Sequence, residues 1–212
     1  DFRALAKEYG LWIIEDACHA PGGYFTDSKG MQQNCGNAAY ADLAIFSFHP
    51  VKHIATGEGG MITTNSKELY EKLLVLRTHG ITRDSSKFVG YPAASGNGDI
   101  DTEMMGGWYM EMQTLGYNYR IPDMLTALGI SQLARADEGM QRRRQIADRY
   151  DNAFADKAGI KVLNAATNKE QTENGIGHAY HLYIIKVQNR KGLYDYLREH
   201  KIFAQVHYIP VH

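Results

Sequence analysis

One lysine of the chain has neighbours that could make its amine reactive. Lys52 lies in the segment FSFHPVKHIATGEGG, residues 46–60, on a short connection between two predicted strands, among aromatic residues, a proline and glycines. A lysine amine attacks a carbonyl group only when it is uncharged, which requires burial or a nearby positive charge to lower its pKa. Most lysines are solvated surface residues, so the rest of the sequence has to decide between the two interpretations.

A reactive lysine amine condenses with an aldehyde, and pyridoxal phosphate is the biological aldehyde that requires such a lysine. Its pyridinium nitrogen needs a carboxylate partner, and Asp16 in the run IIEDACHAPGG ends a predicted buried strand. Ligands of open α/β sheets bind at that end of the strands, although Asp16 could instead cap a turn or helix. Ser47, five residues before Lys52, could donate its hydroxyl to the phosphate.

A metal-dependent hydrolase is an alternative interpretation of the same region. His49 and His53 are four residues apart, and Cys18 adjoins His19. Pro50 separates the two histidines, and the glutamate of the helical two-histidine zinc motif is absent, which disfavours that site. Cys18 and Cys35 are expected to be unpaired thiols, since two cysteines specify no disulfide framework.

The predicted elements around these residues alternate between helix and strand, which indicates an α/β fold. The pattern predicts a helix over residues 1–10, a strand buried on both faces over 11–17, strands over 41–48 and 59–65, and a helix over 66–80. Residues 82–107 have no usable period and predict a long loop, of the kind that often serves an active site.

The second half of the sequence predicts a long helix followed by a smaller α+β region. The helical period extends over about 35 residues from Ile121, with possible bends at Gly129 and Gly139 and a solvated arginine run at 142–144. Strand patterns then lie at 160–163, 178–187 and 202–209, with a helix at 190–200.

Four segments together resemble the DegT/StrS-type pyridoxal-phosphate sugar aminotransferases, a family of fold-type I architecture. The resemblance covers nearly the whole chain, in order. The segments are IIEDACHA, ADLAIFSFHPVKHIATGEGGMITTN, GYNYRIPDMLTALGISQL and VHYIPVH.

The resemblance implies a role for five residues. Lys52 corresponds to the lysine that forms the internal aldimine and carries the proton, and Asp16 to the partner of the pyridinium nitrogen. His19 stands where the family has a residue beside the ring hydroxyl, and Ser47 where a hydroxyl holds the phosphate. Asn118 corresponds to the residue that reaches the phosphate in the neighbouring subunit, which implies a homodimer with shared sites; without the resemblance it could be a turn residue.

The implied reaction moves an amino group from L-glutamate to a keto-sugar nucleotide. SFHPVK and GGWYMEMQTLGYNYR look closest to the branch that aminates a 4-keto-6-deoxy-N-acetylhexosamine nucleotide on the pseudaminic acid pathway. Related sugar dehydratases have a histidine in place of the lysine, so Lys52 argues against that activity. A cofactor-binding regulatory or inactive protein of the same fold remains an alternative.

Composition and length complete these expectations. A formal net charge of −1 gives no sign of nucleic-acid binding, and no apolar run approaches the roughly 20 residues of a membrane span, so we expect a cytoplasmic protein. The phosphate-binding turn and the ring-stacking aromatic that family members carry before the acid strand are absent. We therefore expect a fragment, with the second half of the large cofactor-binding domain and its linking helix at residues 1–150 and part of a small α+β domain at 151–212.

Overall fold

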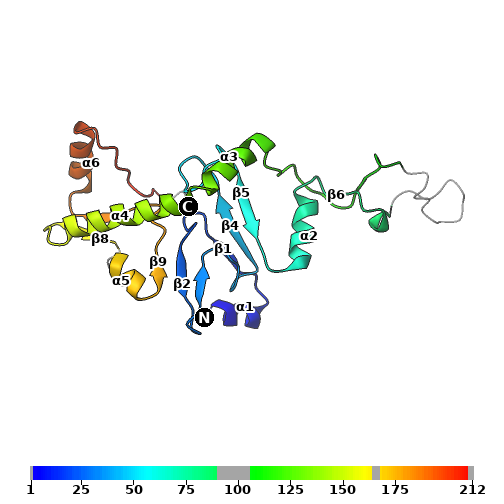
Figure 1. Cartoon of the computed structure of the whole chain (residues 1–212), viewed down its shortest axis with the longest axis horizontal. Coiled ribbons are helices and arrows are strands. Elements are labelled where there is room, and N and C mark those ends of the chain that lie inside the picture. Colours follow the sequence, from blue (N-terminus) through cyan, green and yellow to red (C-terminus); the bar gives the residue numbers. More distant parts are fainter. Residues whose placement is uncertain (1, 90–105, 164–167, 210–212) are drawn as a thin grey trace, which may run out of the picture. The chain divides into compact units, whose positions relative to one another are not determined.

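The computed structural model describes residues 2–89, 106–163 and 168–209 of the chain (Figure 1). The chain divides into two compact units. The first combines residues 1–21 with 34–136, and the second combines 22–33 with 137–212. The expected domain boundary at residue 150 therefore falls inside helix α4, Ala136–Phe154, whereas the units divide where that helix begins.

The first unit contains a three-stranded sheet in the order β1, β4, β5 (Figure 1). Its elements are α1 (Phe2–Tyr9), β1 (Ile14–Asp16), β4 (Leu43–Ser47), β5 (Gly60–Thr63) and α2 (Lys67–Leu76). Strand β1 runs parallel to β4 with Asp16 opposite Ile45, and β5 returns antiparallel to β4 with Ser47 opposite Gly60. Each element lies within a segment where the sequence predicted it, so the α/β class is confirmed.

Strand β1 is less buried than its apolar sequence predicted. Ile14 is 58% exposed, and Leu11 and Trp12 just before the strand are 60% and 67% exposed. Within the described residues, β1 has a partner strand on one edge, β4, so its other edge is unpaired. The expectation of a strand buried on both faces is wrong for this chain, because apolar side chains are covered only where a partner element lies against them.

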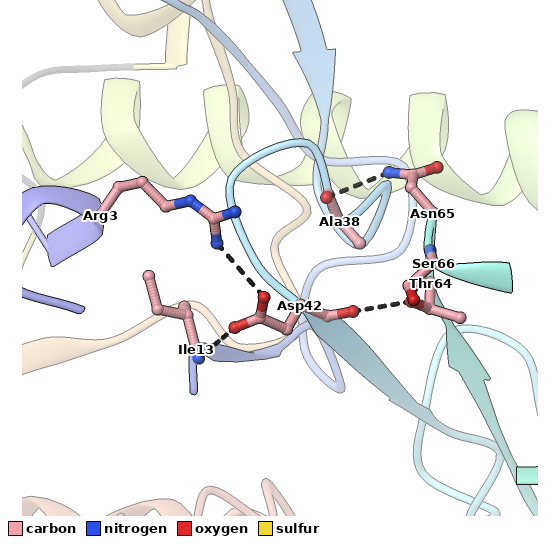
Figure 2. A network of polar contacts seen from close by, with 7 residues as sticks. All are labelled: Arg3, Ile13, Ala38, Asp42, Thr64, Asn65 and Ser66. Carbon is pink, nitrogen blue, oxygen red and sulfur yellow. Dashed lines mark hydrogen bonds and ion pairs between the residues drawn. The ribbon is translucent and has the colours of Figure 1, made fainter. Parts of the chain in front are cut away.

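The amino end of the sheet is held by a polar network around Asp42 (Figure 2). Asp42 Oδ2 accepts the Ile13 backbone N–H at 2.8 Å, and Oδ1 lies 3.4 Å from Arg3 Nη1 on α1. The Asp42 carbonyl accepts the Thr64 hydroxyl at 2.7 Å, and Thr64 Oγ1 in turn accepts the Ser66 N–H at the start of α2. The Asp42 side chain thus connects α1 with the residue before β1, and its backbone carbonyl adds the residue that follows β5.

A short hairpin of β6 (Ile81–Thr82) and β7 (Glu111–Met112) follows α2. Of the predicted loop at 82–107, residues 83–89 contain the short helix η1 (Ser85–Lys87), and residues 90–105 lie outside the described part. Buried Glu111 accepts the Val89 N–H at 2.8 Å and the Tyr109 hydroxyl at 2.9 Å. Trp108 is 75% exposed, so it does not pack in the core of the described residues.

The predicted long helix is two helices, α3 (Asp123–Leu133) and α4. The break lies at Ala134 and Arg135, whereas Gly129 and Gly139, the possible bends, both lie within helices. The Arg135 N–H donates to Gln132 O at 3.1 Å, so the last turn of α3 is tightened to three residues.

The second unit contains two small sheets. Strand β8 (Ile160–Val162) pairs with β10 (Ile185–Val187), and β2 (Tyr24–Thr26) lies between β3 (Gln32–Asn34) and β9 (Ile176–Gly177). Helices α5 (Asn168–Glu173) and α6 (Arg190–Glu199) complete it. The predicted strand at 202–209 is absent, because no described segment forms a ladder with it.

The arginine run on α4 has a structural role that the sequence did not suggest. Arg144 donates to Gly22 O at 3.0 Å and to His178 O at 3.3 Å, and Arg143 donates to Tyr180 O at 3.1 Å. Both side chains are partly buried, so the expectation of a solvated face holds only for exposed Arg142. These bonds satisfy backbone carbonyls that have no strand partner.

None of the helices in the described part of the chain combines the length and apolar character needed to cross a bilayer.

Candidate functional site

The carboxyl ends of β1 and β4 form the site at which the sequence places its chemistry. The two strands are parallel neighbours, so their carboxyl ends lie at the same edge of the sheet. Asp16 is the last residue of β1 and Ser47 the last of β4. Lys52 follows in the connection from β4 to β5. The topology therefore brings three of the five predicted site residues to one edge.

Asp16 is an exposed carboxylate with a fixed hydrogen-bond donor. Its Oδ1 accepts the Cys18 backbone N–H at 3.0 Å. The Cys18 thiol and this N–H lower the pKa of Asp16, and the positive charges of His19 and Lys52 lower it further, against a smaller opposing effect of burial. Asp16 is therefore an anion at neutral pH, as a partner for a protonated ring nitrogen must be.

Lys52 is half-buried, and its charge acts on Asp16. The Lys52 backbone N–H donates to His49 O at 2.9 Å, which makes a turn directly after β4. An amine that contributes to the pKa of the Asp16 carboxyl lies within electrostatic range of it. The amine of Lys52 and the carboxylate of Asp16 thus lie at the same edge of the sheet, where the sequence interpretation expects both groups.

Backbone hydrogen bonds join the two ends of the connection that carries Lys52. The Phe48 N–H donates to Gly59 O at 2.8 Å, and the Thr56 N–H donates to Phe48 O at 2.9 Å. Thr56 is 1% exposed, and its hydroxyl donates to Glu58 O at 2.8 Å. Sequence reasoning missed Thr56, since a single threonine at the start of TGEGG gives no local sign that its hydroxyl closes a loop.

Ser47 and His19 lie beside this pair. Ser47 is half-buried, and its Oγ accepts the His49 N–H at 3.3 Å, which leaves the hydroxyl proton for another acceptor. His19 is exposed, and its positive charge lowers the pKa of Asp16. Both are compatible with a polar ligand at the sheet edge.

Asn118 belongs to a different segment. It forms an isolated antiparallel bridge with Thr78, between Tyr117 and Tyr119, whose rings stack at 4.8 Å. Asn118 is exposed, and no hydrogen bond in the described part of the chain links it to Asp16 or Lys52. The structure thus groups Asp16, His19, Ser47 and Lys52, and leaves Asn118 apart from them.

The metal alternative finds no support at this edge. Among residues 2–89, 106–163 and 168–209, no group of three or more His, Cys, Asp or Glu side chains lies in a position to hold a metal ion. His49 and His53 lie in the turn region after β4 rather than on a helix, so they do not form the helical two-histidine site that Pro50 already disfavoured.

Comparison with known proteins gives one consistent result. The model of the DegT/DnrJ/EryC1/StrS aminotransferase family matches residues 1–212. The chain is 35% identical over 216 residues to the spore coat polysaccharide biosynthesis protein SpsC of Bacillus subtilis, covering 99% of the chain and 49% of the relative. It is 33% identical over 213 residues to a UDP-4-amino-4,6-dideoxy-N-acetyl-beta-L-altrosamine transaminase of Campylobacter jejuni, covering 98% and 47%.

Solved structures agree with this result. A putative sugar aminotransferase from Streptococcus pneumoniae, in its PLP form, superposes with a TM-score of 0.72 at 28% identity, covering 98% of the chain and 46% of that structure. The chain thus spans about half the length of the relatives that it matches. With the family model matching from the first residue to the last, this chain belongs to the DegT/DnrJ/EryC1/StrS aminotransferase family.

Proposed function

We propose that the protein is a cytoplasmic, homodimeric, pyridoxal-phosphate-dependent aminotransferase that moves an amino group from L-glutamate to a 4-keto-6-deoxy-N-acetylhexosamine nucleotide. The observation that carries the proposal is that an anionic Asp16 ends β1 and that Lys52, whose charge acts on the Asp16 carboxyl, follows the neighbouring parallel strand β4. The sugar is proposed from the C. jejuni relative, whose name specifies a UDP-linked amino-dideoxy-N-acetyl sugar.

The residues at the sheet edge fit this cofactor. Asp16 would hold the pyridinium N–H, because Cys18 and two nearby positive charges keep its carboxyl ionised. Lys52 would hold the aldehyde carbon, and Ser47 would donate its hydroxyl to the phosphate. His19 would lie beside the ring hydroxyl. When bound, pyridoxal phosphate supplies an electron sink that makes the α-proton of an amino acid acidic.

Lys52 then acts as the acid and base. Its Nζ would accept the Cα proton of L-glutamate. The amino group would stay on the cofactor and water would supply the carbonyl oxygen, so that 2-oxoglutarate leaves. In the return half-reaction Nζ delivers a proton to the sugar carbon that carried the ketone, and the product is the amino sugar. Asp16 keeps its negative charge throughout, and the closed connection at Phe48, Thr56 and Gly59 keeps Lys52 in place.

Trapping of the lysine tests the proposal. Full-length protein is mixed with pyridoxal phosphate, reduced with borohydride and mapped by peptide mass spectrometry. We expect the adduct on Lys52 and an absorbance band near the visible that Lys52→Ala removes. Lys67→Ala is the matched control, because its side chain is 87% exposed on α2.

Turnover is then measured with L-glutamate and the nucleotide sugar. Lys52→Ala should lose at least about three orders of magnitude in kcat, the scale of a lost acid–base group together with its covalent role. Parental turnover in Lys52→Ala contradicts the proposal. An adduct on Lys52 without any conversion of glutamate contradicts the aminotransferase activity and supports a cofactor-binding protein.

A further inference from the structure

We propose that Cys18 is a positioning residue for Asp16: its backbone N–H and thiol together fix the carboxylate at the end of β1 for the cofactor's ring nitrogen. This inference rests on the proposed function, since it assigns Asp16 that partner. Sequence analysis gave Cys18 no role beyond that of an unpaired thiol. The contacts of the turn after β1 give it one.

The turn that carries Cys18 is bonded to the neighbouring strand. The Ala17 N–H donates to Ile45 O at 2.9 Å, and the Cys18 Sγ lies 3.8 Å from the same carbonyl, within reach of a thiol donor. The Ala20 N–H donates to Ala17 O at 3.0 Å, which closes the turn. Ala17 is fully buried beneath it. Because β4 holds the turn, Cys18 has a fixed position relative to Asp16.

Cys18 presents two donors to one carboxylate. Its N–H lies 3.0 Å from Asp16 Oδ1, and its thiol also interacts with the Asp16 side chain. The single S–H proton therefore has two acceptors in reach, the Asp16 carboxylate and Ile45 O. An exposed aspartate otherwise samples several rotamers, so these contacts select one of them.

The protonation states of the pair support each other. Burial, the hydrogen bond with Asp16 and the negative charge of Asp16 raise the pKa of the Cys18 thiol to about 11, whereas the charge of Lys52 opposes this. The thiol therefore keeps its proton at neutral pH and remains a donor. The groups that act on it are Asp16 and Lys52, and those that act on Asp16 are Cys18, His19 and Lys52.

The first test needs no cofactor. In full-length protein, alkylation of Cys18 by iodoacetamide is followed by peptide mapping from pH 7 to 10, in the parent and in Asp16→Asn. The thiolate is the reacting form, so loss of the negative charge should lower the thiol pKa and speed alkylation at pH 8 by about tenfold for each unit of pKa.

Cys35 is the internal control. Its thiol pKa is raised by burial and by Glu15, and not by Asp16, so its alkylation should be unchanged. An unchanged pH profile at Cys18 overturns the proposal. An equal acceleration at both thiols also overturns it, because this would reflect general loosening of the fold rather than a contact between Cys18 and Asp16.

The second test measures cofactor binding. Cys18→Ala removes the thiol donor, and we expect its Kd for pyridoxal phosphate, from absorbance titration, to rise about tenfold, as for a lost hydrogen bond to a charged group. Cys18→Ser keeps a donor and should bind like the parent. Parental affinity in Cys18→Ala overturns the proposal. If the parent itself binds no pyridoxal phosphate, the proposed function fails, and alkylation still decides whether Cys18 positions Asp16.

Discussion

At the residue scale, the function of the site depends on a carboxylate that stays ionised although solvent reaches it. Asp16 is exposed, and its lowered pKa comes first from the two hydrogen bonds of Cys18. Burial opposes this effect, and the charges of His19 and Lys52 lower the pKa by smaller amounts. Such an arrangement keeps the anion available to a ligand. A buried ion pair would instead need desolvation and rearrangement before the ligand could bind.

The lowered pKa of Asp16 predicts a change in acid stability. A carboxyl whose pKa is lower in the folded state than in the unfolded state stabilises the fold at pH values above its unfolded pKa, which is near 3.8. This stabilisation is lost as the pH falls through the folded-state pKa. Asp16→Asn should therefore lose less stability than the parent between pH 6 and pH 3. The difference in unfolding free energy should be roughly a few tenths of a kcal/mol, because solvent screens the Asp16 carboxyl. Urea unfolding at both pH values measures it, and equal losses would contradict the assignment.

Tyr183 provides a second prediction at this scale. Its hydroxyl donates to Asp151 Oδ1 at 2.7 Å, and burial together with this bond raises the pKa of Tyr183 above its usual range. Tyr183→Phe removes this hydrogen bond to a carboxylate on α4 and should destabilise the second unit by about 2 kcal/mol in urea unfolding. Tyr196→Phe is the control, because Tyr196 is 57% exposed on α6 and its loss should cost almost nothing. Equal midpoints for the two variants would contradict the prediction.

At the scale of elements, the parallel pairing of β1 with β4 is what brings Asp16 and Ser47 together. Asp42 fixes the opposite end of these strands, through Ile13, Arg3 and Thr64 (Figure 2). A change at Asp42 should therefore affect stability and, by loosening the register of β1, cofactor binding as well.

Asp42→Ala should destabilise the first unit by about 2 kcal/mol, since it removes a charged acceptor from a partly buried backbone N–H. Thermal or urea unfolding of full-length protein measures this. Asp195→Ala is the control, because it removes only an exposed i,i+4 ion pair with Lys191 on α6, which solvent screens. A loss at Asp42 no larger than at Asp195 would contradict the role of the network.

The elements around the site could be predicted because their signals are local. Apolar runs ending in Asp16 and Ser47, and the Ser66 cap of α2, are visible within a few residues. The hairpin of β2 and β3 was missed, because three-residue strands have no measurable period and its turn depends on Asp27, which accepts two backbone N–H groups.

Distant partners explain the other differences. Arg144 donates to carbonyls that lie 122 and 34 residues away in the chain, and no local pattern indicates that. The contact of the Cys18 thiol with Ile45 O joins two strands and is equally invisible in the sequence. The family resemblance supplied the roles proposed for His19 and Asn118, which the residues alone could not.

At the scale of the whole molecule, the chain spans about half the length of its relatives. Parts of its surface are apolar. Helix α3 has no buried residue, and Met124, Ile130 and Leu133 are 83%, 67% and 61% exposed. Helices that are apolar on several sides are normally covered. The proposed homodimer gives this helix and the segment around Asn118 a partner.

Shared sites predict complementation between inactive variants. If Asn118 serves the site that contains the partner's lysine, Lys52→Ala and Asn118→Ala homodimers should each be impaired. Unfolding and refolding the two together should then restore about a quarter of parental activity, because half of randomly paired dimers carry one intact site. Mixed preparations that remain as inactive as the Lys52→Ala homodimer would show that each site is built within one subunit.

The closed base of the Lys52 connection restricts the length of this segment rather than its composition. Because Phe48 is bonded to both Gly59 and Thr56, the number of residues between these anchors sets where the amine lies along the sheet edge. Insertion scanning should therefore find that a single added residue between 49 and 55 abolishes lysine trapping, whereas substitutions at exposed Val51 are tolerated. Homologous proteins under the same constraint would diverge here by exchanging side chains, and would gain or lose residues in other surface segments.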